Sequence, residues 1–541
     1  MRRAAFLSLF LTLPLTACRM PQLPPPPQTV PEASGHLHTS SHAEVIAFLD
    51  AVDAAADPRV QRRVFGVTPE GRELPLLVIA DPPVRSPEEA RASGLPVVLV
   101  MANIHAGEVE GKEACLQLLR EVVWDETAPW PLAGVVTLIA PIYNADGNDA
   151  FGPGQRPLQN GPAPVGRRET AKGLDLNRDY LKLENVEARH LVRLIAEWDP
   201  HVVVDLHTTN GSAHGYELTY APPLTPSAHP ELLRTLAADW LPLLRARMRE
   251  RHGFETFDYG NFLTERGAFQ DEPDRVTGWQ TFDHRPRFGN NYAGLRNRLG
   301  ILSEAYAYAD FPVRIAATRA FVVEILQLVA ERGAQVPALC QRLDVETAEA
   351  AAAGRLEQAL GAKAVPRGAP EELLLRGFEL VTDPASGEKR RVAAGPLTRI
   401  EVPCSVVFAA TATRSAARAY LLPPGRVDLL ELLDAHGVRY EILTEARPEL
   451  VRIWTVAATS QASRPFQGHR QRTTSWETAD AERLLQPGSV RVSTAQPLGR
   501  LVFELLDPEA EDGLFAWNFF DESIAAGTGS AAPVWGLFRP E

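Results

Sequence analysis

Three apolar runs in this chain lead directly into side chains that bind metals or carry protons. The runs are residues 97–104, 201–206 and 299–302, and the side chains that belong with them are His105, His207 and Glu304. Each run has the length and the β-branched content of a buried strand. In α/β proteins, side chains at the carboxyl ends of such strands meet at one edge of the sheet. The pattern therefore predicts an α/β fold with a functional site at that edge.

The two histidines and one nearby carboxylate form a ligand set for zinc. Glu108 lies three positions after His105, on the turn that follows the first run. Catalytic zinc usually takes three protein ligands and keeps a fourth position for water, and two His plus one Glu is among the sets that proteins use. The predicted ligands are therefore His105, Glu108 and His207, with one Zn²⁺ per chain.

Helical patterns lie between and after the strands. Residues 112–123 carry apolar side chains at helical spacing, and residues 312–333 form a longer amphipathic pattern with proline at its start and glycine at its end. Strands that alternate with helices favour an α/β domain. We expect the second helix to close this domain.

The segment from about residue 40 to 335 resembles the zinc carboxypeptidases of the M14 family, the family of carboxypeptidase A. A His-x-x-Glu pair alone is a weak signal, but here a whole series of matches follows the order of the family. The matches are residues 66–74, the pair His105 and Glu108, residues 144–147, residues 175–178, His207 and Glu304. The resemblance implies an α/β fold of the zinc carboxypeptidase type, with a mixed sheet and helices on both faces.

The resemblance also implies a role for several residues. Zinc would polarise the scissile carbonyl and lower the pKa of its bound water to about 7. Glu304 would take the proton from this water and pass it to the leaving amine. Asn177 and Arg178 would bind the free carboxylate of the substrate, for which a planar guanidinium is suited. The implied substrate is a peptide with a free C-terminal carboxylate.

An arginine is expected beside the metal, because the tetrahedral oxyanion needs a further cation or donor. Arg167 and Arg168 lie shortly before Asn177, where the family has such an arginine. Arg168 is the predicted residue, Arg167 is the alternative and Arg156 is a more distant one. The competing interpretation is that Arg167, Arg168 or both are solvent-exposed loop residues without a role in the site.

Two further residues follow from the resemblance. Asp175 occupies the place of a carboxylate that hydrogen-bonds a ligand histidine, and its expected partner is His105. The family has a mobile tyrosine that contacts substrate, and Tyr292 is the nearest tyrosine upstream of Glu304. The pocket that selects the substrate side chain is expected between His207 and Glu304, where basic, acidic and apolar preferences all stay open.

The amino terminus resembles a bacterial lipoprotein signal. Two arginines precede an apolar stretch, residues 4–15, that is too short to span a membrane, and the sequence Leu-Thr-Ala-Cys follows at residues 15–18. The resemblance implies lipidation of Cys18; a secretory signal with an incidental cysteine is the alternative. Residues 21–31 are rich in proline and would form a stiff spacer. We expect a protein of the bacterial cell envelope, lipid-anchored on the periplasmic or extracellular side.

The chain divides into five predicted segments. Residues 1–18 are the lipoprotein signal, 19–38 a Pro-rich linker, 39–335 the catalytic domain, 336–364 a helical linker, and 365–541 a smaller C-terminal domain. The last segment has short strand-like runs between turn signals and one helical pattern, which predicts a β-rich α/β domain. Its role does not follow from the pattern.

Charge and cysteine content narrow the class of protein. The formal net charge is −13 and no block of Lys and Arg occurs, which argues against nucleic acid as the partner. Besides Cys18, three cysteines remain, and three do not make a disulfide framework. A single pair between Cys340 and Cys404 is one alternative, and Cys115 is expected as a small hydrophobic residue on its helix.

The leading hypothesis is a zinc metallocarboxypeptidase that removes C-terminal residues from peptides. A zinc amidase or deacylase that acts on cell-wall peptides or N-acylated amino acids is the alternative. The third hypothesis is a non-catalytic peptide-binding lipoprotein. It is disfavoured because the chain has the complete zinc ligand set and also the expected base, Glu304.

Overall fold

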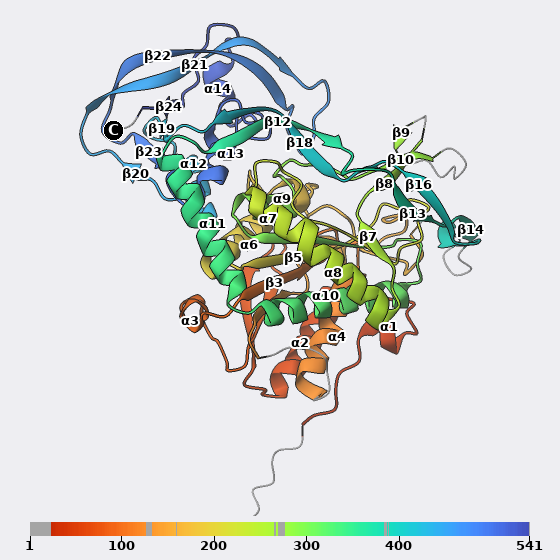
Figure 1. Cartoon of the computed structure of the whole chain (residues 1–541). Helices are drawn as coiled ribbons and strands as arrows, with labels where there is room; N and C mark the ends of the chain where they lie inside the picture. Colours follow the sequence, from red (N-terminus) through yellow and green to blue (C-terminus); the bar gives the residue numbers. More distant parts are fainter. Residues whose placement is uncertain are drawn as a thin grey trace, which may run out of the picture.

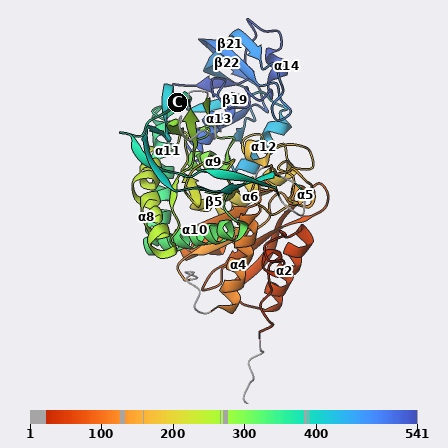
Figure 2. The same cartoon turned by 90° about the vertical axis from the view of Figure 1, so that its right-hand side faces the viewer.

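The computed structural model describes residues 23–125, 133–157, 159–264, 267–268, 276–382, 387 and 389–539. The predicted signal segment with Cys18 lies outside these residues. Figure 1 shows a large N-terminal lobe built around one sheet, with the C-terminal part of the chain resting on one side of it. Figure 2 shows the same arrangement from the side, with β21 and β22 at the end farthest from α2 and α4.

The N-terminal lobe contains the predicted mixed sheet, and this sheet has eight strands. Its strand order is β1-β2-β4-β3-β5-β11-β6-β7. The central strands β4, β3, β5 and β11 are mutually parallel. β1 and β2 run antiparallel to their neighbours, and β6 is antiparallel to β11 but parallel to β7. The bounds are β1 Val60–Val67, β2 Glu73–Ile79, β3 Val97–Ala102, β4 Val136–Ala140, β5 Val202–Thr208, β6 Leu218–Ala221, β7 Thr256–Asp258 and β11 Leu299–Ala305.

Helices cover both faces of this sheet, because successive side chains of its strands point to opposite sides. On β3, Val98 and Val100 pack in one core cluster while Leu99 and Met101 pack in another. The first face is covered by α2 (His42–Ala54), α4 (Glu110–Trp124), α7 (Pro230–Thr235), α8 (Leu241–Arg247) and α10 (Phe311–Arg332). The second is covered by α3 (Pro87–Ser93), α6 (Val186–Trp198) and α9 (Gly289–Leu295). This confirms the predicted fold class.

The strand ends bring the predicted site residues to one edge of the sheet. β3 ends at Ala102, so His105 lies in the turn before α4, as expected. β5 and β11 extend further than their apolar runs suggest and include His207 and Glu304. These two residues are direct neighbours in the parallel register of the two strands.

The predicted linker at residues 336–364 is helical only in its first part. Helix α11 covers Gln335–Ala352, and Gly354 then adopts a left-handed φ of +68°, which turns the chain out of the helix. Strand β12 follows at Glu357–Val365, so the predicted boundary at residue 365 falls at the end of a strand. The alanine-rich sequence favours a helix by propensity, but pairing with β18 (Val407–Ser415) overrides it.

The segment that follows forms two-stranded sheets and adds one strand to a four-stranded sheet of the N-terminal lobe. Strand β17 (Cys404–Ser405) pairs in parallel with β10 (Val276–Gln280) of that lobe. The other pairs are β13 (Glu371–Leu375) with β16 (Thr398–Val402), and β14 (Phe378–Thr382) with β15 (Lys389–Ala393). β10 also pairs with β8 (Asn261–Thr264), and β8 pairs antiparallel with β9 (Gly267–Ala268). These ribbons run along the lobe in Figure 1.

The rest of the C-terminal region is a six-stranded antiparallel sheet with short helices. Its order is β20-β23-β19-β24-β21-β22. The bounds are β19 Ala419–Leu422, β20 Glu441–Ile442, β21 Arg447–Gln461, β22 Arg472–Leu485, β23 Val490–Ser493 and β24 Trp535–Leu537, with helices α12 Val427–His436, α13 Gly499–Leu506 and α14 Asp521–Ile524. The predicted helix in this region is thus confirmed as α12. The two long strands β21 and β22 form a hairpin whose tip comprises residues 462–471.

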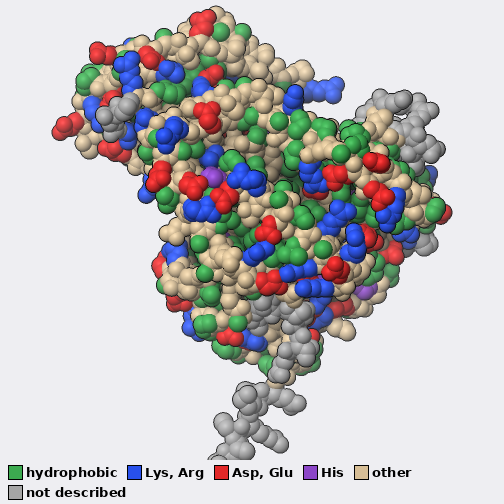
Figure 3. Space-filling model, in the orientation of Figure 1, with side chains coloured by type: hydrophobic (Ala, Val, Ile, Leu, Met, Phe, Trp, Pro, Cys, Tyr) green, Lys and Arg blue, Asp and Glu red, His purple; other side chains and the backbone are tan. Residues whose placement is uncertain are grey.

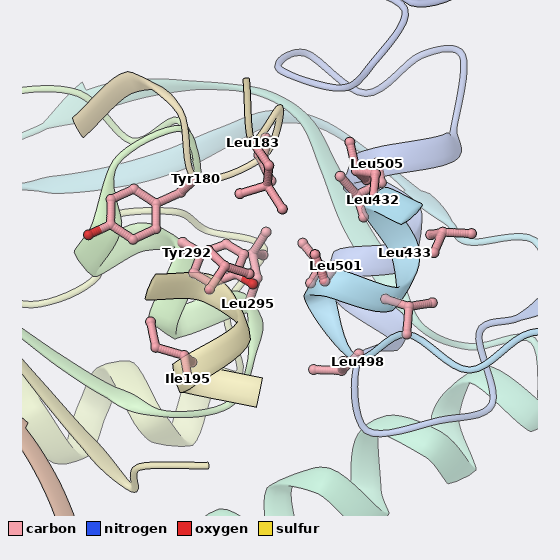
Figure 4. Packing of buried hydrophobic residues seen from close by; sticks show 14 of the residues in the cluster. Tyr180, Leu183, Ile195, Tyr292, Leu295, Leu432, Leu433, Leu498, Leu501 and Leu505 are labelled. Atoms are coloured by element: carbon pink, nitrogen blue, oxygen red, sulfur yellow. The ribbon is translucent and has the colours of Figure 1, made fainter. Parts of the chain in front are cut away.

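One continuous apolar cluster joins the two parts of the chain. Residues of α6 and α9 face residues of α12 and α13 across the junction (Figure 4). Tyr292 of α9 lies in this cluster, and its hydroxyl bonds to His436 Nδ1 over 2.8 Å. His436 Nε2 donates to Leu181 O over 3.1 Å. Burial lowers the pKa of His436 to about 3, so this histidine is neutral and completes a polar link inside the junction.

Smaller features complete the description of the fold. Short elements are α1 (Val30–Ala33), α5 (Ala145–Asp149), the 3₁₀ turn η1 (Leu176–Arg178) and the π-helical turns η2 (Leu236–Trp240) and η3 (Met248–His252). Cys115, Cys340 and Cys404 are buried and free, so the Cys340–Cys404 alternative is not realised. Lys, Arg, Asp and Glu are interspersed on the face seen in Figure 3. Among the described residues, no helix combines the length and the apolar character needed to cross a membrane.

Candidate active site

The three predicted ligands converge at the carboxyl edge of the sheet. One ligand atom from each of His105, Glu108 and His207 lies within 4.8 Å of the others. His105 Nδ1 is 3.1 Å from Glu108 Oε1, and His207 Nδ1 is 3.1 Å from Glu108 Oε2. The two Nδ1 atoms are 3.2 Å apart. All three side chains are buried, so they form a compact donor set that faces one common point.

A carboxylate lies beside the outer nitrogen of each histidine, and for His105 this contact is a hydrogen bond. His105 Nε2 lies 3.0 Å from Asp175 Oδ1, and His207 Nε2 lies 2.9 Å from Asp205 Oδ2. Such partners fix the ring orientation and tautomer, so that the other nitrogen is free to bind a metal. Asp205 was not singled out from the sequence. It stands two positions before His207 on β5, and this spacing on one face of a strand could have revealed it.

The electrostatics of the donor set suit a cation. Burial raises the pKa of Glu108, but His105 and Arg156 lower it by more, and the net pKa lies well below its usual range. Burial lowers the pKa of His207, whereas Asp205 and Glu108 raise it well above its ordinary value. The buried carboxylates therefore stabilise positive charge at this point. Two imidazole nitrogens and a carboxylate are a donor set that fits zinc.

Glu304 lies beside this cluster with an oxygen that has no partner in the described part of the chain. It is the neighbour of His207 across the strands and is only 7% exposed, and its Oε2 atom makes no hydrogen bond there. Burial raises the pKa of Glu304 to about 8, and the nearby carboxylate of Glu108 adds to the effect. An unpaired buried carboxyl group of this kind is suited to hold and release a proton.

Asn177 and Arg178 project into the same cavity from η1, a turn capped by Asp175. Asp175 Oδ1 accepts from Asn177 N over 2.8 Å, which begins the turn. Asn177 Oδ1 accepts from Gly289 N over 3.0 Å, which leaves the amide nitrogen to donate toward the cavity. Burial lowers the pKa of Arg178, and the neighbouring Arg168 and Arg287 act in the same direction. A guanidinium in this position would be stabilised by an anionic ligand.

Of the three candidate arginines, two reach the donor set. Arg168 donates to Asp175 Oδ2 over 2.9 Å and lies 3.4 Å from Glu108 Oε1. Arg156, expected to be more distant, donates to Glu108 Oε1 over 2.9 Å. Gly107 makes this approach possible, because a Cβ atom there would lie 2.5 Å from Arg156 Cγ. Arg167 instead donates to Thr170 O over 2.7 Å.

An aromatic wall closes the cavity beyond Glu304. The cavity has a volume of about 110 Å³, and its apolar lining comes from Tyr259, Phe282, Phe288 and Leu302. The rings are in mutual contact, with centroids 5.6 Å apart for Tyr259 and Phe282 and 5.2 Å apart for Phe282 and Phe288. The wall comes from the stretch between His207 and Glu304 where the sequence predicted a specificity pocket. Its apolar character was not evident from the mixed charges there.

Tyr292 does not belong to this site, which corrects the prediction that it binds substrate. Its ring is 1% exposed and packs in the junction with the C-terminal region. Its hydroxyl is engaged by His436 and by Arg296 Nη1, which is 3.1 Å away. The short sequence distance between Tyr292 and Glu304 was misleading. Tyr292 lies on helix α9, which packs against one face of the large sheet and not at the carboxyl edge where the site lies. The tyrosine that does line the cavity is Tyr259.

Comparisons with known proteins agree with this chemistry. Residues 45–271 match the peptidase M14 family, described as zinc carboxypeptidase. Carboxypeptidase 2 of Trichophyton tonsurans is 23% identical over 486 residues, which cover 86% of this chain and 80% of the relative. Carboxypeptidase 2 of Trichophyton rubrum is 23% identical over 493 residues, with 86% and 81% covered. These alignments extend beyond the matched domain into the C-terminal region.

One of the solved structures that this chain matches is a metallo-carboxypeptidase from Burkholderia cenocepacia. It is 18% identical in sequence, with a TM-score of 0.40, and the match covers 54% of this chain and 70% of that chain.

Proposed function

We propose that the chain, in which residues 45–271 match the zinc carboxypeptidase family, removes C-terminal residues from peptides. The observation that carries the proposal is the single cavity that holds His105, Glu108, His207, Glu304, Asn177 and Arg178 together. A metal set alone would serve many amide hydrolases. A carboxylate-binding pair in the same cavity favours an exopeptidase.

His105, Glu108 and His207 would hold the zinc ion. When bound, zinc supplies a Lewis acid for the scissile carbonyl and lowers the pKa of water beside it. Asp175 and Asp205 keep the two imidazole rings oriented toward the metal position. Arg156 keeps the Glu108 carboxylate in place through its hydrogen bond.

Glu304 is the proposed base. Its unpartnered Oε2 atom would accept a proton from the attacking water and deliver it to the nitrogen of the leaving amino acid. Arg168 is placed to stabilise the oxyanion that develops on the scissile carbonyl, because its guanidinium lines the cavity and is held by Asp175. Asn177 and Arg178 would bind the substrate carboxylate and so set the position of the bond that is cleaved.

The aromatic wall defines the proposed side-chain preference. Tyr259, Phe282, Phe288 and Leu302 offer an apolar surface of a size that suits one residue. In the part of the lining that the structure describes, the carboxylates are Glu108 and Glu304, both assigned to the chemistry. We therefore propose that apolar C-terminal residues are preferred over basic ones.

The function is tested with purified, zinc-loaded protein and a peptide library whose products are read by mass spectrometry. Single residues are expected to be lost from free C-termini, apolar residues first, and amidation of the C-terminus is expected to abolish cleavage. The same peptides with acetylated amino termini serve as the control and should be cleaved as before. Cleavage that is undiminished by amidation would move the protein to the amidase class.

We also propose that the protein is a lipoprotein of the bacterial envelope. The support is the arginine-led apolar stretch that ends at Cys18. The proline-rich segment after it was predicted to be a free spacer, but its described residues pack against α4, where Trp124 and Arg120 donate to the carbonyls of Pro24 and Pro27. In a bacterial host, the full chain is expected in the membrane fraction, and Cys18→Ser is expected to release it or leave it uncleaved. An unmodified Cys18 in the mass spectrum of the mature chain would refute the lipid anchor.

A further inference from the structure

A second, larger cavity opens directly beside the metal site. It has a volume of about 530 Å³ and shares Arg168, Arg178 and Asn210 with the smaller cavity. Most of its lining comes from the N-terminal lobe. Phe466 and Gln467, however, come from the tip of the β21–β22 hairpin in the C-terminal region. A segment almost 300 positions away from Asp175 in the sequence therefore forms part of the wall next to the catalytic residues.

The hairpin tip contains a tight turn at residues 466–469. Phe466 and His469 exchange two backbone hydrogen bonds, of 2.7 and 3.0 Å, around the two residues between them. Gln467 and Gly468 both have left-handed backbone angles, with φ of +51° and +80°. This is the two-residue hairpin turn that normally places Asn or Gly at both positions. A glutamine at the first position keeps a long polar side chain at the turn, at the expense of backbone preference.

Contacts with the N-terminal lobe hold the tip beside the cavity. His469 Nε2 lies 2.8 Å from Glu184 Oε1. The guanidinium of the buried Arg287 lies 5.5 Å from the Phe466 ring centroid and is itself held by Asp512, with 2.8 Å between Arg287 Nε and Asp512 Oδ1. These contacts involve charged groups from both parts of the chain. They position the turn without covering Phe466, which stays 40% exposed.

Gln467 connects the turn to the ligand set. Its Oε1 atom accepts from Asp175 N over 2.7 Å, and the Asp175 carboxylate orients His105. The turn therefore has a fixed place relative to the metal ligands and to the scissile bond.

We propose that Phe466 and Gln467 form a subsite for the residues of a peptide that precede the scissile bond. The inference rests on the proposed carboxypeptidase function, in which Asn177 and Arg178 hold the terminal carboxylate in the smaller cavity. That cavity has room for one side chain, so the rest of the peptide must leave through the larger one. There it meets the exposed face of Phe466, which offers apolar contact. The C-terminal region thus contributes to substrate selection and favours extended peptides over minimal ones.

The test compares two substrates with the same C-terminal dipeptide, a blocked dipeptide and an octapeptide with apolar residues before the scissile bond. Phe466→Ala is expected to lower kcat/KM for the octapeptide about tenfold, mainly through KM, because the apolar contact between the peptide and the exposed face of Phe466 is lost. For the blocked dipeptide, the same variant is expected to show a far smaller loss of kcat/KM. The matched control is Leu484→Ala, which removes an exposed apolar side chain from the same hairpin away from the cavity and should leave both substrates as in wild type.

The outcomes separate the two proposals. If wild-type protein cleaves both substrates and Phe466→Ala keeps the wild-type kcat/KM for the octapeptide, the subsite is refuted and the carboxypeptidase function stands. An equal loss for both substrates also refutes it, because the hairpin would then act on the site as a whole. If zinc-loaded wild-type protein cleaves neither substrate, the proposed function fails and the subsite with it.

Discussion

Glu304→Gln is expected to bind zinc as the wild type does and to lose about 10²- to 10⁴-fold in kcat, the range that a positioned general base contributes. The change keeps the size of the side chain and removes only its ability to accept a proton. Glu304 Oε2 makes no hydrogen bond among the described residues, so a neutral amide breaks no internal contact there. Steady-state kinetics and metal analysis of the same preparation measure the two quantities.

A suitable control for this variant is Glu187→Gln. Glu187 is also a buried glutamate with unpartnered oxygens, and burial raises its pKa as well, but it lies on α6 outside the cavity. Glu187→Gln should retain wild-type turnover. This result would show that the loss of turnover in Glu304→Gln does not come merely from removing a buried carboxyl group. Turnover of Glu304→Gln at the wild-type rate would refute the assigned mechanism.

His207→Ala is expected to lose both zinc and activity, and Asp205→Asn to lose only part of its affinity for zinc. The first change removes one of three donors. The second leaves the donor in place but weakens the partner that orients it, which typically costs about 10–100-fold in metal affinity. Competition with a chromophoric chelator gives both affinities. The essential part of the prediction is that His207→Ala loses more zinc affinity than Asp205→Asn.

The control for the metal experiment is His214→Ala, which removes a buried histidine outside the donor set. Burial lowers the pKa of His214 to about 3, so its loss removes a neutral ring from the interior and no cation. This variant should bind zinc with wild-type affinity even if it is less stable. Stoichiometric zinc in His207→Ala, or wild-type affinity in Asp205→Asn, would contradict the proposed ligand geometry.

Prediction from sequence succeeded where local pattern and chemistry coincide. The strand that leads to His105 is apolar and β-branched, and the helix that follows has a clear stripe, so both elements could be placed. The helix at Phe311–Arg332 has a proline in its first turn and is followed directly by Gly333, as its sequence indicated. The sequence also placed the donors at strand ends, where a parallel sheet brings them together.

Prediction failed where a residue acts through its place in the packed structure. Tyr292 is near Glu304 in sequence, but helix α9 carries it into the junction with α12. Tyr259 is farther away in sequence, but it reaches the cavity. Arg156 lies in a loop whose path depends on Gly107, and no local pattern indicates that path. The strand at Glu357–Val365 depends on a partner strand far along the chain, which an alanine-rich sequence does not reveal.

The sequence by itself determined the proposed chemistry of this protein: two histidines and a glutamate as the proposed zinc ligands, a glutamate as the proposed base, and an asparagine and an arginine proposed to bind a carboxylate. These residue types and their strand-end positions carry that information locally. The tertiary structure decided what surrounds them, including Asp205 behind His207, the aromatic wall, and Phe466 and Gln467 from the C-terminal hairpin. The physical reason is that a cavity wall is built from segments brought together by long-range packing, and the contacts that hold them, such as His469 with Glu184, join residues whose separation in the chain gives no sign of their proximity.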